Sequence, residues 1–190
     1  MTTRHMPLTT IVPFKTIAPF AAMMITLVLA SNILVHFHIN SWLTYGAFSY
    51  PLTFLVSDLC NRLYGITAAS RVVKIGLIGM GLTFVFAYFD IGGWGVTYRV
   101  GVAAVLAYII GQTADLIVFD KLRQATWWRA PMFSSLSAAF LDSVIFYSLA
   151  FYGILDNWLQ LSMGDFAIKL IAVAFGVIVY RPLLKKLLTI

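Results

Sequence analysis

The sequence of 190 residues contains no glutamate and only seven aspartates, and charged residues make up 11% of it. A soluble domain of this length normally carries about twice that share of charge. Hydrophobic residues make up 61% of the chain, and the mean hydropathy is +0.92. The composition therefore excludes an ordinary soluble domain and indicates a protein whose main partner is the lipid bilayer.

Other absences narrow the function. The single cysteine, Cys60, excludes an internal disulfide and a cysteine-cluster metal site. There is no Gly-x-x-x-x-Gly-Lys-Ser/Thr phosphate loop and no Gly-x-Ser-x-Gly nucleophile turn, and none of the histidines lies in a long apolar segment. We therefore expect no ATP hydrolysis by this chain, no catalytic residue, no metal site and no cofactor.

Six apolar segments approach the roughly 20 residues that a membrane-spanning helix needs. They cover residues 17–35, 46–64, 72–89, 99–119, 132–153 and 165–180. The segments are continuously apolar and do not alternate as the strands of a membrane barrel do. No linker separates them, so the sequence predicts an all-α polytopic membrane protein: one transmembrane domain, residues 1–190, with six helices in one bundle.

The basic residues predict the orientation of the bundle. Eleven of them fall at the N-terminus, at the C-terminus or at the connections that share their side of the membrane, whereas Arg99 alone lies at an opposite span end. Both termini are therefore predicted to be cytoplasmic. Because no basic helix or tail stands apart from the spans, the net charge of +6 does not indicate a nucleic-acid partner.

Four charged residues lie well inside the predicted spans: Asp58, Asp115, Asp142 and Lys169. An ionisable group in hydrocarbon costs a few kcal/mol, so it usually has a partner or a task. Gln112 stands three residues before Asp115 and shares its helix face. Charges converging from four helices predict a polar cavity or relay at the centre of the bundle, where substrates pass.

Small residues at four-residue steps precede two of these acids. They are Ala103, Ala107 and Gly111 before Asp115, and Ser134 and Ala138 before Asp142. Small residues let a neighbouring backbone approach closely. Both carboxylates are therefore expected to face the protein interior and not lipid.

Structural alternatives remain for these residues. Asp58 and Arg62, four residues apart, have the spacing of a structural ion pair. Alternatively, Asp142 serves only to neutralise Lys169, or the Lys169 side chain extends outwards to the membrane interface. Gln112 and Asp115 alternatively form hydrogen bonds that hold two helices together.

Two further residues are weaker candidates for substrate contact. Asn32, at the end of the first span, is either a helix-packing hydrogen bonder or a ligand contact. Phe48 either packs or stacks on a flat ring. Carboxylates, a carboxamide and aromatic faces together are the chemistry that recognises a purine-like edge.

The order and spacing of several motifs resemble those of a known family. They are Ser31–Val35, Tyr45–Leu55 with Asp58-Leu59, Gly111-Gln112 with Asp115, Val118-Phe119, Leu122–Gln124, Trp127-Trp128-x-Ala-Pro131, Asp142-Ser143, and Asp165-Phe166-x-x-Lys169. In this order, between Ser31 and Leu184, the chain is similar to the queuosine-precursor transporters, which are also catalogued as vitamin uptake transporters.

The resemblance implies six helices, no enzymatic activity, and uptake of 7-cyano-7-deazaguanine or its 7-aminomethyl relative across the cell inner membrane. Some members carry Gly-Asn where this chain has Ala139-Phe140, which leaves the choice between the two compounds open. A secondary carrier is the leading hypothesis, with Asp58, Gln112, Asp115 and Asp142 reading the ring and its amine and Lys169 as a charge partner or gate. One aspartate is expected to exchange a proton.

Three alternatives accompany the carrier hypothesis. The chain has the size and helix number of a substrate-binding subunit that docks on a separate energising module. The chain is also a candidate homodimer. An intramembrane enzyme requires a nucleophile and base pair that the sequence does not show.

Overall fold

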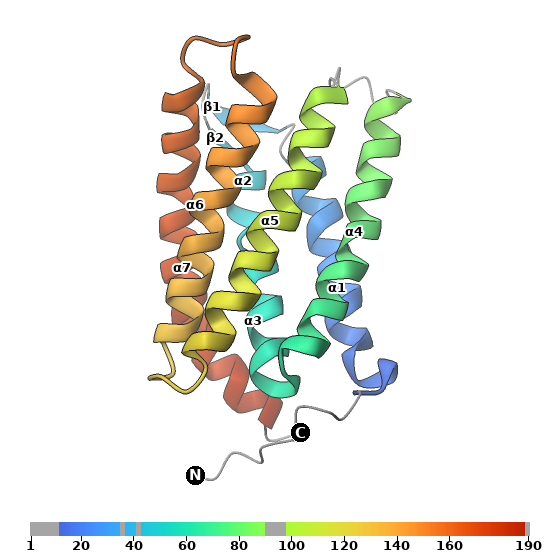
Figure 1. Cartoon of the computed structure of the whole chain (residues 1–190), viewed down its shortest axis with the longest axis vertical. Coiled ribbons are helices and arrows are strands. Elements are labelled where there is room, and N and C mark those ends of the chain that lie inside the picture. The colour runs from blue at the N-terminus through green and yellow to red at the C-terminus, as the bar shows by residue number, and fades with distance from the viewer. Residues whose placement is uncertain (1–11, 35–36, 41–42, 90–97, 189–190) are drawn as a thin grey trace.

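The computed structural model describes residues 12–34, 37–40, 43–89 and 98–188. This part of the chain forms α1 (Phe14–Leu34), β1 (His38–Asn40), β2 (Leu43–Thr44), α2 (Gly46–Ser49), α3 (Leu52–Tyr64), α4 (Ile66–Tyr88), α5 (Tyr98–Leu122), α6 (Arg129–Phe151) and α7 (Trp158–Leu188). Helices α1, α4, α5, α6 and α7 are long and apolar enough to cross a membrane. They run side by side along the longest axis of the molecule (Figure 1), as expected of a multi-pass membrane protein.

The short antiparallel pair β1 and β2 is a small departure from the all-α prediction, and it lies in the connection between α1 and α2. Helix α3 occupies the middle of the bundle, behind α5 in Figure 1. It contacts α1, α4, α5, α6 and α7. Its buried residues include an unbroken run from Val56 to Asn61, so the helix is enclosed on every side. Polar side chains on α3 therefore point at other helices and not at lipid.

The second predicted span, 46–64, is interrupted at Pro51. Proline lacks an N–H and its ring excludes the carbonyl group four residues earlier, which breaks the helical hydrogen-bond ladder. Here the bonds shorten to three-residue steps, from the Thr53 N–H to the Tyr50 carbonyl (3.0 Å) and from the Phe54 N–H to the Pro51 carbonyl (3.2 Å). Neither α2 nor α3 reaches the length of a span, so a sixth crossing, by α2 and α3 together, stays a prediction.

Most of the other helices extend beyond the boundaries that the sequence predicted for them. Helix α4 begins at Ile66 instead of residue 72, directly after Gly65, whose φ of 89° ends α3. Arg71, which stands before the predicted span, therefore lies inside the helix, because no residue after Gly65 breaks the helix. Helix α7 begins at Trp158, before the predicted 165, and near its end it bends beneath the bundle in Figure 1. The predicted end of the first span, Val35, lies outside the described residues.

Gly76 marks a close approach of α4 to α1 and α5. A Cβ atom at this position would overlap the hydroxyl group of Tyr108 and the side chain of Met24. Tyr108 has no exposed surface, and its hydroxyl donates to the carbonyl oxygen of Val73 at 2.9 Å, which fixes the ring in place. The neighbouring helices therefore have no room for a larger residue here.

We expect Gly76→Ala to lower the free energy of unfolding by about 1–3 kcal/mol, because it overpacks this contact. Gly81→Ala is the matched control on the same helix, since a Cβ atom there meets nothing within 4 Å. That substitution should be neutral or slightly stabilising, because alanine favours helix over glycine. Thermal unfolding of both purified variants in detergent measures the difference, and equal shifts would contradict the close contact.

Candidate functional site

Three polar side chains on α3 form a stripe that faces α5. Thr53, Ser57 and Asn61 stand four residues apart, which places them on one helix face. Gln112 Nε2 donates to Thr53 Oγ1 at 3.0 Å, and Ser57 Oγ donates to Asp115 Oδ2 at 2.7 Å. The third contact is longer, from Asn61 Nδ2 to a backbone carbonyl of α5 at 3.4 Å. We call this line of contacts the α3–α5 polar seam.

Each contact of the seam leaves one oxygen atom without a partner. Gln112 Oε1, Asp115 Oδ1 and Asn61 Oδ1 are buried and accept no hydrogen bond from the described part of the protein. All three side chains have 0% exposure. A buried acceptor without a donor costs about 1–3 kcal/mol, so each of these oxygens retains the capacity to accept from a water molecule or from a bound ligand. The seam thus offers a row of acceptors to a molecule rich in N–H groups.

Asp58 lies beside this seam and approaches Asp115. Ser134 Oγ donates to Asp58 Oδ1 at 3.1 Å, and Ser135 Oγ donates to Asp58 Oδ2 at 3.3 Å. The two aspartates are 1% and 0% exposed, and neither forms an ion pair with any described residue.

The structural pairing of Asp58 with Arg62 was wrong. The spacing permits it, but the Arg62 side chain runs towards the end of the bundle, where its Nε donates to the Tyr180 hydroxyl at 3.0 Å. The serines of α6 take its place as partners of Asp58. The carboxylates of α3 and α5 therefore lie in the bundle interior without an ion pair to any described residue.

A second polar cluster, between α6 and α7, is charge-paired. Lys169 Nζ lies 2.6 Å from Asp142 Oδ2 and 2.5 Å from Asp165 Oδ2, and it is 5% exposed. Tyr50 donates its hydroxyl to Asp142 Oδ1 at 3.0 Å, and Ser143 donates to Asp165 Oδ2 at 2.6 Å. Both oxygens of Asp142 are occupied, and Lys169 does not snorkel outwards. We call these five residues the Lys169 cluster.

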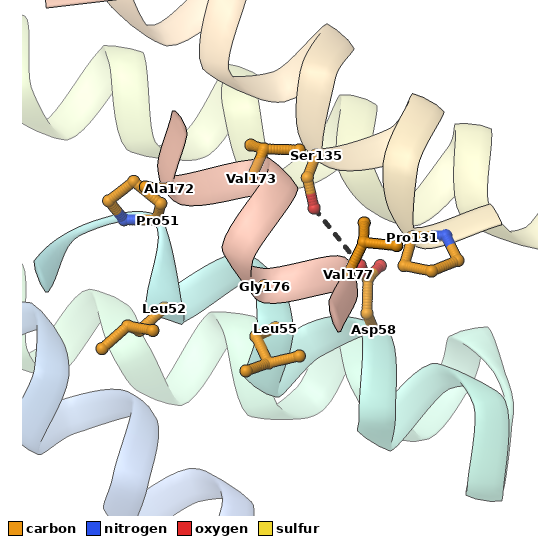
Figure 2. Close-up of a pocket in the computed structure, with 10 residues that line it drawn as sticks. All are labelled: Pro51, Leu52, Leu55, Asp58, Pro131, Ser135, Ala172, Val173, Gly176 and Val177. Carbon is orange, nitrogen blue, oxygen red and sulfur yellow. Dashed lines mark hydrogen bonds between the residues drawn. The ribbon is translucent and has the colours of Figure 1, made fainter. Parts of the chain in front are cut away.

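A groove between α3, α6 and α7 reaches Asp58. Figure 2 shows the Asp58 carboxylate and the Ser135 hydroxyl joined by a hydrogen bond, with small and apolar side chains around them. Ala172 and Gly176 of α7 form part of its wall, and Leu52 and Leu55 of α3 form another part. The enclosed part has room for about one water molecule. A ring-shaped ligand therefore requires the helices to separate.

The structure brings five of the seven candidate residues into these two clusters. Asn32 and Phe48 lie elsewhere. Asn32 Nδ2 donates to the Val28 carbonyl at 2.9 Å and approaches Met80 Sδ at 3.2 Å, so it joins α1 to α4. Phe48 is 44% exposed on α2. Their proposed substrate contacts gain no support from these positions.

Sequence reasoning missed several members of the clusters. Thr53, Ser57 and Asn61 carried a detectable signal, because they repeat every four residues through an apolar segment. Asp165 stands four residues before Lys169, which is ion-pair spacing on a helix. Tyr50 carried no such signal, since its contact with Asp142 spans 92 residues of the chain.

Comparisons with known proteins find relatives for most of the chain. Residues 44–181 match the family described as "Putative vitamin uptake transporter". The chain is 32% identical over 164 residues to the "Queuosine precursor transporter" of Escherichia coli (strain K12), a match that covers 76% of this chain and 74% of that protein. No solved structure matches the chain significantly.

A second relative comes from Haemophilus influenzae. It is described as a "Probable queuosine precursor transporter", and it is 30% identical over 161 residues, or 73% of this chain and 66% of the relative. The match to the family covers most of the helical bundle, including both polar clusters. This chain therefore belongs to the vitamin uptake transporter family, whose relatives include the queuosine precursor transporters.

Proposed function

We propose that the chain is a secondary carrier that imports a deazapurine precursor of queuosine across the inner membrane. The candidate substrates are 7-cyano-7-deazaguanine and its 7-aminomethyl relative. Both carry the guanine-type edge, on which a ring N–H and an exocyclic amine stand side by side as donors. The row of unpaired acceptors in the α3–α5 polar seam is the observation that supports this proposal.

The chemistry of that edge matches the seam. A carboxylate accepts two adjacent N–H groups, and hydrogen bonds to a charged acceptor are the stronger kind. Asp115 supplies a free carboxylate oxygen, and Gln112 and Asn61 supply carboxamide oxygens on either side along the seam. In this proposal Asp115 and Gln112 accept hydrogen bonds from the donor edge of the ring. Asp58, which accepts from Ser134, lines the same site.

The Lys169 cluster has a different role in the proposal. Because Lys169 and Tyr50 occupy both oxygens of Asp142, this acid has little accepting capacity left for a ring. The cluster instead holds α6 and α7 together beside the helix break at Pro51. We assign Asp142 and Lys169 to positioning of the helices and not to direct contact with the ring.

The substrate proposal is tested in a strain that cannot make the precursor. The strain carries this chain and receives each compound at low concentration, and queuosine in its tRNA is the readout. We expect rescue by at least one of the two compounds. Rescue by neither compound, with the protein present in the membrane, overturns the substrate assignment.

The carrier proposal is tested with the purified chain in liposomes. Uptake by the chain alone, as monomer or homodimer, supports a self-sufficient carrier, whereas a silent chain that rescues cells indicates a separate energising module. We also infer that Asp58 or Asp115 exchanges a proton during transport, because the two buried acids lack a base. Uptake indifferent to a pH gradient and to uncouplers removes the proton step.

A further inference from the structure

Two arginines tie α3 to α5 at the end of the bundle where α1 begins and α7 ends. Arg62 Nη1 donates to the backbone carbonyl of Arg123 at 2.5 Å. Arg123 Nη2 donates in return to the backbone carbonyls of Asn61 and Arg62, at 2.6 Å and 3.0 Å. We call this reciprocal pair the arginine clasp.

The clasp extends to α7 through Arg62. Its Nε donates to the Tyr180 hydroxyl at 3.0 Å, and its guanidinium carbon lies 5.1 Å from the centre of the Phe119 ring. Phe119 and Tyr180 are fully buried and meet edge to face, and Leu183 of α7 packs against the same cluster. Three helices therefore close on one another at this end.

The clasp continues the two helices that carry the α3–α5 polar seam. Arg62 stands one helical turn beyond Asp58, and Arg123 stands two turns beyond Asp115. A ring that inserts between α3 and α5 must push these helices apart, because direct hydrogen bonds of 3.0 Å and 2.7 Å already join their side chains along the seam. Any such movement pulls directly on the hydrogen bonds of the clasp.

The chemistry of the clasp suits a contact that opens and closes. Its acceptors are mainly backbone carbonyls at helix ends, which can turn to water when the clasp opens; the Asn61 carbonyl also accepts from the Gly65 N–H at 2.9 Å. Burial lowers the pKa of the Arg123 guanidinium, and the nearby Asp120 carboxylate opposes this shift. Arg123 is half-buried, so its head group needs little movement to reach solvent.

We propose that Arg62 and Arg123 form the gate at this end of the transport path, which the charge pattern predicts to be cytoplasmic. The inference rests on the proposed transport function. The clasp holds α3 against α5 in the closed state and releases them when the substrate leaves the seam. The two arginines are positioning residues, since they act by fixing the helices and do not read the ring.

Cys60 provides a native reporter for this gate. It is the single cysteine of the chain, it has 0% exposure, and it lies in the last two turns of α3 beside Asn61. The probe is a membrane-impermeant methanethiosulfonate, applied to inverted vesicles and to right-side-out vesicles. We expect Arg123→Ala to speed Cys60 labelling by about tenfold in inverted vesicles, because two hydrogen bonds that hold the end of α3 are lost.

Two controls accompany this variant. Arg129→Ala removes the same charge at the start of α6, from an exposed side chain that lies over the Trp128 ring, and it should label at the wild-type rate. Tyr180→Phe removes the hydroxyl that accepts from Arg62 and keeps the buried ring, so it should speed labelling by a smaller factor.

The outcomes separate a gate from general loosening. Faster labelling of Arg123→Ala in inverted vesicles alone supports the gate. Faster labelling in both orientations, or no acceleration in either, overturns it. The readout requires no substrate, so failure to transport a deazapurine contradicts the proposed function without changing the labelling result.

Discussion

We expect Asp115→Asn to reduce uptake of the proposed deazapurine substrate by about 10- to 100-fold, because hydrogen bonds to a charged acceptor contribute about 1.5–3 kcal/mol. Asparagine keeps the shape of the side chain and one oxygen that accepts from Ser57, whose hydroxyl lies 2.7 Å from Asp115 Oδ2. It removes the second acceptor that the guanine-type edge requires. Initial rates of uptake, normalised to the amount of protein in the membrane, measure the effect.

The same substitution should leave folding intact. Asp115 is fully buried beside Asp58 and has no ion-pair partner among the described residues, so removal of a carboxylate relieves a desolvation cost. We expect an unchanged or higher melting temperature together with the loss of uptake. Asp156→Asn, in the exposed connection between α6 and α7, is the control and should change neither property. Full uptake by Asp115→Asn would remove Asp115 from the recognition site.

Replacing Lys169 with methionine should lower the free energy of unfolding by about 3–5 kcal/mol, because it leaves uncompensated carboxylates in the protein interior. The side chains of Lys169, Asp142 and Asp165 are 6%, 8% and 14% exposed, so water screens the remaining acids poorly. Thermal unfolding in detergent measures the loss. Lys121→Met, at the exposed end of α5, should have little effect.

A second set of variants identifies the cause of that loss. Asp142→Asn and Asp165→Asn, added to Lys169→Met, remove the charges that the lysine balanced. Most of the lost stability should return in the triple variant, because a neutral cluster needs no counter-charge. A triple variant as unstable as Lys169→Met alone would show that the methylene chain of Lys169, and not its charge, holds α6 against α7.

Local patterns in the sequence predicted the presence of the helices better than the residues at which they begin and end. Long apolar runs locate α1, α5 and α6 because insertion into hydrocarbon is governed by composition over a whole window. Pro51 was visible in the sequence, but its interruption of the ladder between α2 and α3 was not foreseen. The early start of α7 was missed because its first turns contain polar residues, such as Gln160 and Ser162, that precede the apolar run.

The candidate site was predictable in part, because the free-energy cost of burying a charged residue indicates which residues have a role. Buried charges are expensive, so Asp58, Asp115, Asp142 and Lys169 stood out, and the contact of Asp142 with Lys169 is confirmed. The partners of Asp58 were not predictable, because Ser134 lies 76 residues away and only the packing of α6 on α3 brings it close.

The polar content of α3 bears on how the chain enters the membrane during synthesis. A translocon releases a segment into lipid according to its own composition, and one Asp or Arg at the centre of a helix opposes release by about 2.5–3.5 kcal/mol. Helix α3 carries Asp58, Asn61 and Arg62, whose partners on α5, α6 and α7 are synthesised later. We therefore expect this segment to stay beside the translocon until its partner helices arrive, so that its insertion is coupled to the folding of the whole bundle.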